Sequence, residues 1–203
     1  MKIDHHMAKV INPFIVTGKI EPEYFCDRVT ESARLIKSVT NGNNLVIISP
    51  RRMGKTGLIQ FCYDKSEIAA EYYTFFIDIL HTSSLREFTY LLGREIYETL
   101  LPRSRKMADL FIQTIKSISG KFGFDPITGM PTFNVELGDI DRPEYTLDEI
   151  FQYLGHADKP CIVAIDEFQQ IAKYPEKNIE AQLRRTFKSC VTATSSSPEA
   201  SAT

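Results

Sequence analysis

The chain has 203 residues, of which 43% are hydrophobic and 25% charged, and its net charge is −2. This length suits one domain with a sizeable core, and the near-neutral charge gives no electrostatic support for an obligate nucleic-acid or membrane partner. The four cysteines, Cys26, Cys62, Cys161 and Cys190, form no metal-binding or redox motif. We therefore expect a reducing compartment and no zinc site. The start lacks the apolar core of a signal peptide and no run is long enough to span a membrane, which predicts a cytoplasmic protein.

Helical and strand patterns alternate from the beginning of the chain, which predicts an α/β protein with a parallel sheet. Residues 1–26 form a lead-in segment. Asp27 can cap a helix that runs to about Val39 and ends at Asn41-Gly42. An apolar strand is predicted over residues 45–48.

That strand runs into Ser49-Pro-Arg-Arg-Met-Gly-Lys-Thr56, which resembles the phosphate-loop pattern G-x-x-x-x-G-K-[ST] with Ser49 in place of the first glycine. Backbone N–H groups of such a loop bind phosphate together with the start of the next helix, and Gly54 permits close approach. We expect Lys55 to reach the β and γ phosphates and Thr56 to bind Mg²⁺. The predicted nucleotide-binding residues of this segment are Ser49, Pro50, Arg51, Arg52, Met53, Gly54, Lys55, Thr56 and Gly57. Taken alone, the motif also fits a solvated basic loop between two ordinary elements.

The middle of the chain continues the alternation. A strand is predicted over residues 72–79, and Ser83 or Ser84 caps a long helix that ends at Pro102. A further helix is expected over about residues 104–118.

Residues 121–137 break this pattern, because apolar and polar residues alternate on both sides of the turn-rich stretch 125–131. This is typical of a β-hairpin, inserted here as either a platform for a partner or a stabilising appendage. Thr146 is then expected to cap a helix that leads to the next strand.

Cys161-Ile-Val-Ala-Ile-Asp-Glu-Phe168 is an apolar run that ends in two carboxylates, which suits a buried strand of a parallel sheet. Ligands of such sheets bind beyond the carboxyl ends of the strands. Asp166 is therefore predicted to hold Mg²⁺, as in a Walker B motif, and Glu167 to orient or deprotonate the attacking water. The alternative is a strand followed by two solvated acids. Because the loop and this strand occur in the expected order, we predict a nucleotide site with Lys55 and Glu167 as catalytic residues.

These motifs together resemble an archaeal-type AAA-like ATPase family, which belongs with the STAND-like branch of P-loop NTPases. The resemblance covers about residues 12–184. It rests on Asn12-Pro-Phe-Ile-Val-Thr-Gly18, Phe25-Cys-Asp-Arg28 with Glu31, the Ser-Pro-Arg-Arg loop and Ile165-Asp-Glu-Phe-Gln169. It implies a three-layer α/β/α P-loop NTPase fold, with ATP and Mg²⁺ as ligands and hydrolysis as the activity. It also implies an adenine-side position for Arg28, although Asp27 replaces the glycine of the family's box.

Two functional classes stay open, an ATPase switch or motor and a nucleotide-binding scaffold or interaction fragment without useful hydrolysis. Either leaves room for a protein partner, which the sequence does not identify. The short basic cluster of Arg103, Arg105 and Lys106 is typical of a solvated helix start and argues against a nucleic-acid partner.

Residues 27–190 are predicted to form an incomplete ATPase core, and residues 191–203, which are of low complexity, a disordered tail. ATPases of the resembled family continue into a sensor strand and then a lid, which this chain is expected to lack. We expect the missing strands to leave an unpaired edge and exposed apolar surface beside residues 45–48, with poor solubility or marginal stability.

The tail also suggests a frameshift. Back-translation of residues 186–203 with ordinary codons, read from the third base, gives IQIVCNSNFIFAGSQRH, and its second half resembles the next strand of the family. One hypothesis is a frameshift near Arg184 or Arg185, and the other is a naturally disordered tail. The coding DNA distinguishes them.

Overall fold

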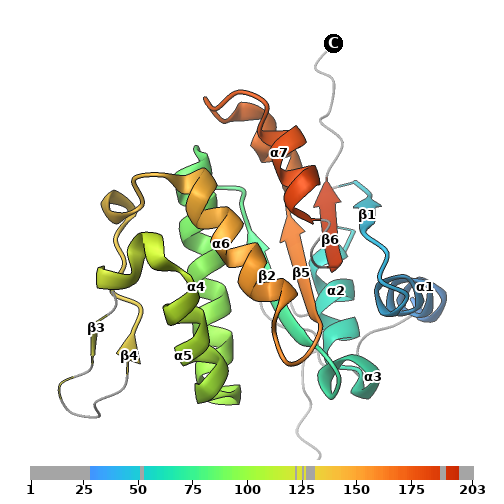
Figure 1. The fold of residues 1–203 in the computed structure, drawn as a ribbon. Coiled ribbons are helices and arrows are strands. Elements are labelled where there is room, and N and C mark those ends of the chain that lie inside the picture. The colour runs from blue at the N-terminus through green and yellow to red at the C-terminus, as the bar shows by residue number, and fades with distance from the viewer. Residues whose placement is uncertain are drawn as a thin grey trace, which may run out of the picture.

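The computed structural model describes residues 28–50, 53–121, 123–124, 126, 131–187 and 191–196. Its main sheet has four parallel strands in the order β1-β6-β5-β2. These strands are β1 (Leu45–Ile48), β2 (Tyr73–Asp78), β5 (Cys161–Asp166) and β6 (Val191–Ser196). Helices lie on both faces of the sheet (Figure 1), which is the predicted three-layer α/β/α arrangement.

β5 is the most buried strand, since all six of its residues are buried. Its side chains alternate between the two faces of the sheet. Val163 and Ile165 belong to one apolar core and Ile162 and Ala164 to the other. The continuous apolar run in the sequence therefore reflects a strand that is covered on both sides.

One face is covered by α1 (Val29–Thr40), α2 (Lys55–Tyr63) and the short α3 (Ser66–Ala69). Leu35 and Val39 of α1 pack with Leu58 and Ile59 of α2 in the smaller core. Arg28 stands at the N-cap position of α1, and the predicted cap Asp27 lies outside the described residues.

The opposite face is covered by α4 (Leu85–Arg103), α5 (Arg105–Thr114) and α6 (Pro143–Gly155). The predicted cap Ser84 is confirmed, because its hydroxyl accepts a 3.3 Å hydrogen bond from the Glu87 N–H. The helix predicted over residues 104–118 is shorter than expected. The buried Glu149 carboxylate accepts the N–H groups of Lys116 (3.2 Å) and Ser117 (3.1 Å), and the chain continues there as the 3₁₀ segment η2 (Lys116–Lys121).

The predicted cap Thr146 is wrong, because α6 begins three residues earlier at Pro143. Proline suits the first helical turn, where its missing N–H has no intrahelical partner to lose. The buried Thr146 hydroxyl instead donates to the Arg142 carbonyl inside the first turn, at 3.2 Å.

The predicted hairpin is present in a short form, with β3 (Gly123–Phe124) antiparallel to β4 (Pro131–Thr132). The 3₁₀ segment η3 (Leu137–Asp139) follows it. Phe133 anchors this insertion on α4, with its ring centroid 6.0 Å from that of Tyr90 and 5.8 Å from that of Tyr97.

The strand β6 corrects the prediction that the chain is disordered from residue 191. Residues 191–196 lie between β5 and β1 and pair with both, so the expected gap at this place in the sheet is filled. The sequence Val-Thr-Ala-Thr-Ser-Ser has no apolar periodicity, so its composition alone does not indicate a strand. A strand between two neighbours is held largely by main-chain hydrogen bonds, and Val and Thr suit the pleated backbone. Residues 197–203 lie outside the described part.

The 3₁₀ segment η4 (Phe168–Lys173) and α7 (Ile179–Thr186) connect β5 to β6. At the other side of β6, β1 forms the end of the described sheet. Leu45 and Ile47 pack against the α1–α2 core, whereas Val46 and Ile48 are 62% and 71% exposed. The expected apolar edge beside residues 45–48 is thus present in this part of the chain. No helix in the described segments is both long and apolar enough to cross a bilayer.

Candidate functional site

Three chain segments meet at the carboxyl ends of the parallel strands. The loop of residues 49–56 follows β1, Asp166 ends β5 and Asp78 ends β2, in register with Asp166. This edge is the usual ligand-binding side of such sheets.

Gly54 makes the turn from this loop into α2. It occupies the N-cap position of the helix in the left-handed region, at φ +69°, and its carbonyl accepts the Leu58 N–H at 3.0 Å. A Cβ atom at this position would meet no other atom within 4 Å, so the backbone conformation rather than lack of space favours glycine. The first N–H groups of α2 have no partners within the helix and face the loop, as in anion-binding helix starts.

Lys55 joins the two ends of the loop. Its side chain is only 7% exposed, and Nζ donates to the Ser49 carbonyl at 3.2 Å. The ammonium group is thereby held over the loop instead of extending into solvent. Of the other predicted loop residues, Pro50 and Met53 are exposed and Gly57 lies half-buried in the first turn of α2, while Arg51 and Arg52 lie outside the described residues.

Thr56 and Asp166 bring the two sequence motifs together. The Thr56 hydroxyl donates to Asp166 Oδ2 at 2.6 Å, and the Asp166 side chain is buried. Hydroxyl and carboxylate oxygens are the hard ligands that Mg²⁺ accepts, and this ion commonly takes only one or two side chains and keeps several waters. The donor set therefore fits Mg²⁺.

Glu167 follows with an unusual backbone. Its φ of 57° and ψ of 40° are left-handed, which is strained for a residue with a Cβ atom. Asp166 Oδ1 accepts the Glu167 N–H at 2.9 Å and stabilises this turn. The Gln169 side-chain amide donates to Glu167 Oε2, so the carboxylate is oriented from within its own segment.

Arg28 contacts the same loop from α1. Its guanidinium donates to the carbonyl of Met53, the residue before Gly54. The family resemblance implies an adenine-side position for Arg28, which stays a prediction, and the structure adds a direct contact with the backbone of the loop.

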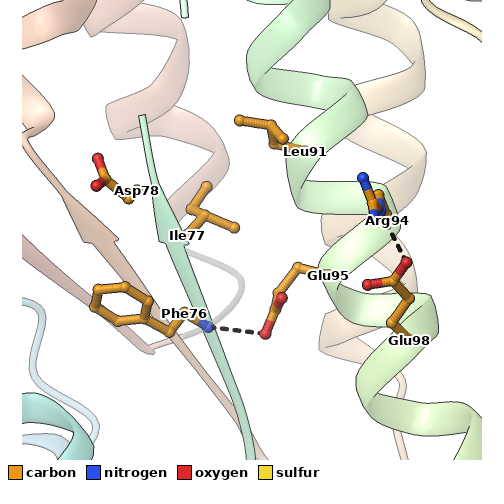
Figure 2. A pocket seen from close by; sticks show the side chains of 7 residues that line it. All are labelled: Phe76, Ile77, Asp78, Leu91, Arg94, Glu95 and Glu98. Carbon is orange, nitrogen blue, oxygen red and sulfur yellow. Dashed lines mark hydrogen bonds and ion pairs between the residues drawn. The ribbon is translucent and has the colours of Figure 1, made fainter. Parts of the chain in front are cut away.

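A separate pocket of about 270 Å³ lies at the outer edge of β2, between β2 and α4 (Figure 2). It contains none of the residues of the 49–56 loop and shares only Asp78 with the strand ends described above, so it is distinct from the candidate nucleotide site. Glu95 accepts the Phe76 N–H at 3.5 Å, and burial raises the pKa of Glu95. This contact gives a partner to an N–H group that the end strand would otherwise leave open.

Two contacts of the site were not predicted from the sequence. Gln169 belongs to the family motif, and the sequence predicts no role for it, although its position two residues after Glu167 is a signal for a local contact. The bond between Arg28 and Met53 joins residues 25 positions apart, and no local pattern indicates it.

Comparisons with known proteins agree with this geometry at the level of the fold. No protein-family model and no curated protein matches the chain. Among solved structures it is similar to the Walker-type ATPase PABY2304 of Pyrococcus abyssi, with TM-score 0.51 and 18% identity over 91% of this chain and 49% of that one.

Two further similar structures come from Aeropyrum pernix. The ORC2 protein, in ADPNP-ADP complexes, has TM-score 0.54 and 16% identity over 85% of this chain and 42% of that one. The ORC1 protein, in complex with DNA, has TM-score 0.51 and 13% identity over 88% and 42% of the two chains. This chain therefore spans about half or less of the length of these structures. At such identities the likeness is one of fold, and the chain has the α/β P-loop NTPase fold.

Proposed function

We propose that the chain binds ATP with Mg²⁺ and hydrolyses it at the site formed by the 49–56 loop, Asp166 and Glu167. The observation that carries the proposal is the 2.6 Å hydrogen bond between Thr56 and Asp166, which are 110 positions apart in the sequence. A solvated basic loop and an unrelated strand end have no reason to meet in this way. The shared P-loop NTPase fold supports the proposal.

In this proposal the backbone N–H groups of the loop and the start of α2 bind the β and γ phosphates. Lys55 moves from the Ser49 carbonyl to the phosphate oxygens, a stronger charge-assisted partner. Thr56 and Asp166 hold Mg²⁺, which supplies positive charge against the phosphate oxygens when bound. Ser49, Pro50, Arg51, Arg52, Met53 and Gly57 complete the loop.

Glu167 acts on the attacking water. The water oxygen forms a bond to the γ phosphorus as the bond from that phosphorus to the β,γ-bridging oxygen breaks. ADP leaves with the electron pair, Glu167 takes a proton of the water, and ADP and inorganic phosphate result. The Asp166 carboxylate holds the Glu167 backbone in this strained turn, directly after the strand end where the two motifs meet.

Three finer assignments belong to the same proposal. We infer ATP rather than GTP, membership of the STAND-like branch and an adenine-side position for Arg28 from the family resemblance. The scattered cysteines support a cytoplasmic location. We do not propose DNA as a ligand of this chain, because its net charge of −2 gives no electrostatic support for binding to nucleic acid.

Steady-state phosphate release from ATP and Mg²⁺ tests the proposal, with wild type and Glu167→Gln compared. Loss of the general base should lower kcat by about 100-fold or more, while ATP affinity stays similar because Glu167 is not a phosphate ligand. Turnover in the wild type that does not exceed that of Glu167→Gln would show that this chain does not hydrolyse ATP. Retained ATP affinity in that case would leave a nucleotide-binding module without catalysis.

A further inference from the structure

Gln169 is the polar side chain nearest in sequence to Glu167 that the mechanism above does not use. Its amide nitrogen donates to Glu167 Oε2, while its carbonyl oxygen Oε1 is buried and has no hydrogen-bond partner among the described residues. The opposite amide orientation is excluded by chemistry, because an ionised carboxylate only accepts hydrogen bonds and cannot face a carbonyl oxygen. The oxygen is therefore the unpaired end of the amide.

A buried carbonyl oxygen without a partner is costly, and a folded protein keeps such a group only for a structural or catalytic reason. The surroundings of Gln169 leave it little freedom to find another partner. Phe168 packs against the core, with its ring centroid 6.1 Å from that of Phe187. The side-chain amide of Gln170 donates to the Thr82 carbonyl at 2.9 Å. The two adjacent glutamines thus diverge, one toward the loop after β2 and the other toward Glu167.

A general base must hold its carboxylate within reach of the proton that it takes. The Gln169 N–H bonds to Glu167 Oε2 and so restricts the rotation of this carboxylate. The Gln169 carbonyl oxygen is packed too closely to contact a water, so the N–H end of the amide is the end that acts on the site.

We propose that Gln169 is a positioning residue for ATP hydrolysis, whose amide N–H orients the Glu167 carboxylate toward the attacking water. This inference rests on the proposed function and adds to it a determinant of the position of the general base. The water still gives one proton to Glu167 as its oxygen bonds to the γ phosphorus, and Gln169 exchanges no proton or electron pair.

The test uses the full chain and four variants, with kcat and KM for phosphate release, affinity for a fluorescent ATP analogue and the unfolding temperature measured for each. Gln169→Ala should lower kcat about 10- to 100-fold with ATP affinity changed by less than about threefold, since the lost contact orients Glu167 and not the nucleotide. Gln169→Glu has the same size but cannot donate to a carboxylate, so it should lose as much. It also replaces Gln169→Ala if that variant folds poorly.

Two comparisons separate positioning from stability. Gln170→Ala removes the neighbouring amide from the same short helix and should leave kcat within about twofold of wild type. In a Glu167→Gln background, Gln169→Ala should cause no further loss, because Gln169 acts through Glu167. Three results would overturn the inference and leave the proposed ATP hydrolysis intact. These are a wild-type kcat in Gln169→Ala, a loss of kcat in Gln170→Ala that equals the loss in Gln169→Ala, and fully additive losses of kcat in the double variant. A wild type without Glu167-dependent turnover would overturn both.

Discussion

Gly54 and Glu167 both have left-handed backbones, and they stand on the two sides of the site. Gly54 (φ +69°) adopts this conformation at little cost, whereas Glu167 (φ 57°) carries a Cβ atom and is strained by about 1–2 kcal/mol. The Asp166 carboxylate offsets this strain through its bond to the Glu167 N–H. Strain at a functional site persists only where neighbouring contacts maintain it.

Substitution of Gly54 by alanine should affect both folding and binding. We expect Gly54→Ala to lower the free energy of unfolding by about 1 kcal/mol, because the left-handed conformation penalises a Cβ atom. It should also weaken ATP binding, since the loop must shift to relieve the strain. Denaturant unfolding and ATP titration measure the two effects.

Gly42→Ala is the matched control, because Gly42 has a similar φ of +74° and open space at the end of α1. It should lose similar stability and keep its ATP affinity. Wild-type ATP affinity in Gly54→Ala would contradict the assignment of the loop.

The meeting of the two motifs was predictable, because the fixed spacing within each motif reports its chemistry. Local patterns indicate Lys55, Thr56, Asp166 and Glu167, and the Thr56–Asp166 hydrogen bond joins the two motifs. The roles of these residues in binding and hydrolysis stay predictions. The contacts of Gln169 and Arg28 were not predictable in the same way. They depend on the left-handed turn at Glu167 and on the packing of α1 beside the loop, neither of which has a local sequence signal.

The strand β6 lies between β1 and β5 and pairs with both. Asn44, just before β1, supplies a polar contact at its start. The Asn44 side chain accepts the Thr192 N–H at 2.8 Å and donates to the Phe187 carbonyl at 3.4 Å. This one amide therefore ties β6 and the end of α7 to β1.

Asn44→Ala should lower the free energy of unfolding by about 1–2 kcal/mol, because it leaves the N–H of a buried residue without its partner. Asn43→Ala is the control, since Asn43 is exposed and only its backbone N–H is bonded, to the Ser38 carbonyl. The control should change stability by less than about 0.5 kcal/mol. Equal stability of the two variants in chemical denaturation would contradict the role of Asn44 at β6.

Strands were predictable where burial leaves an apolar run. The bounds predicted for β1 are confirmed, and β2 and β5 were found because their side chains enter the two cores. β6 was missed because its place depends on neighbouring strands instead of its own composition. The start of α6 was mispredicted because two signals for a helix start lie close together. Pro143 favours the first helical turn and Thr146 favours an N-cap, and the helix begins at Pro143.

β1 is an end strand of the described sheet, and one of its two faces is apolar and exposed. Val46 and Ile48 point away from the α1–α2 core and are 62% and 71% exposed. Figure 1 shows α4 and α6 on the β2 and β5 side of the sheet, so this part of the face has no helix over it in the described structure. Exposed apolar residues on an end strand favour self-association.

We expect the wild-type chain to self-associate with rising concentration and the double variant Val46→Thr, Ile48→Thr to do so less. Threonine keeps the strand preference while it removes apolar surface. Tyr145→Thr on α6 is the control, because Tyr145 is 53% exposed but lies away from the sheet edge. Sedimentation velocity measures the effect, and a wild type that stays monomeric at high concentration would show that this face does not drive association.

The central claim, that the 49–56 loop binds nucleotide, is tested most directly by equilibrium ATP affinity with and without Mg²⁺. Wild type should bind more tightly with Mg²⁺, and Lys55→Ala should lose at least about tenfold in affinity, because a charge-assisted bond to phosphate is removed. Lys65 is the control, because it follows the end of α2 and its ammonium group lies over the Phe61 ring. The Lys65→Ala variant should bind ATP as the wild type does. ATP binding by Lys55→Ala that equals the wild type would contradict the account.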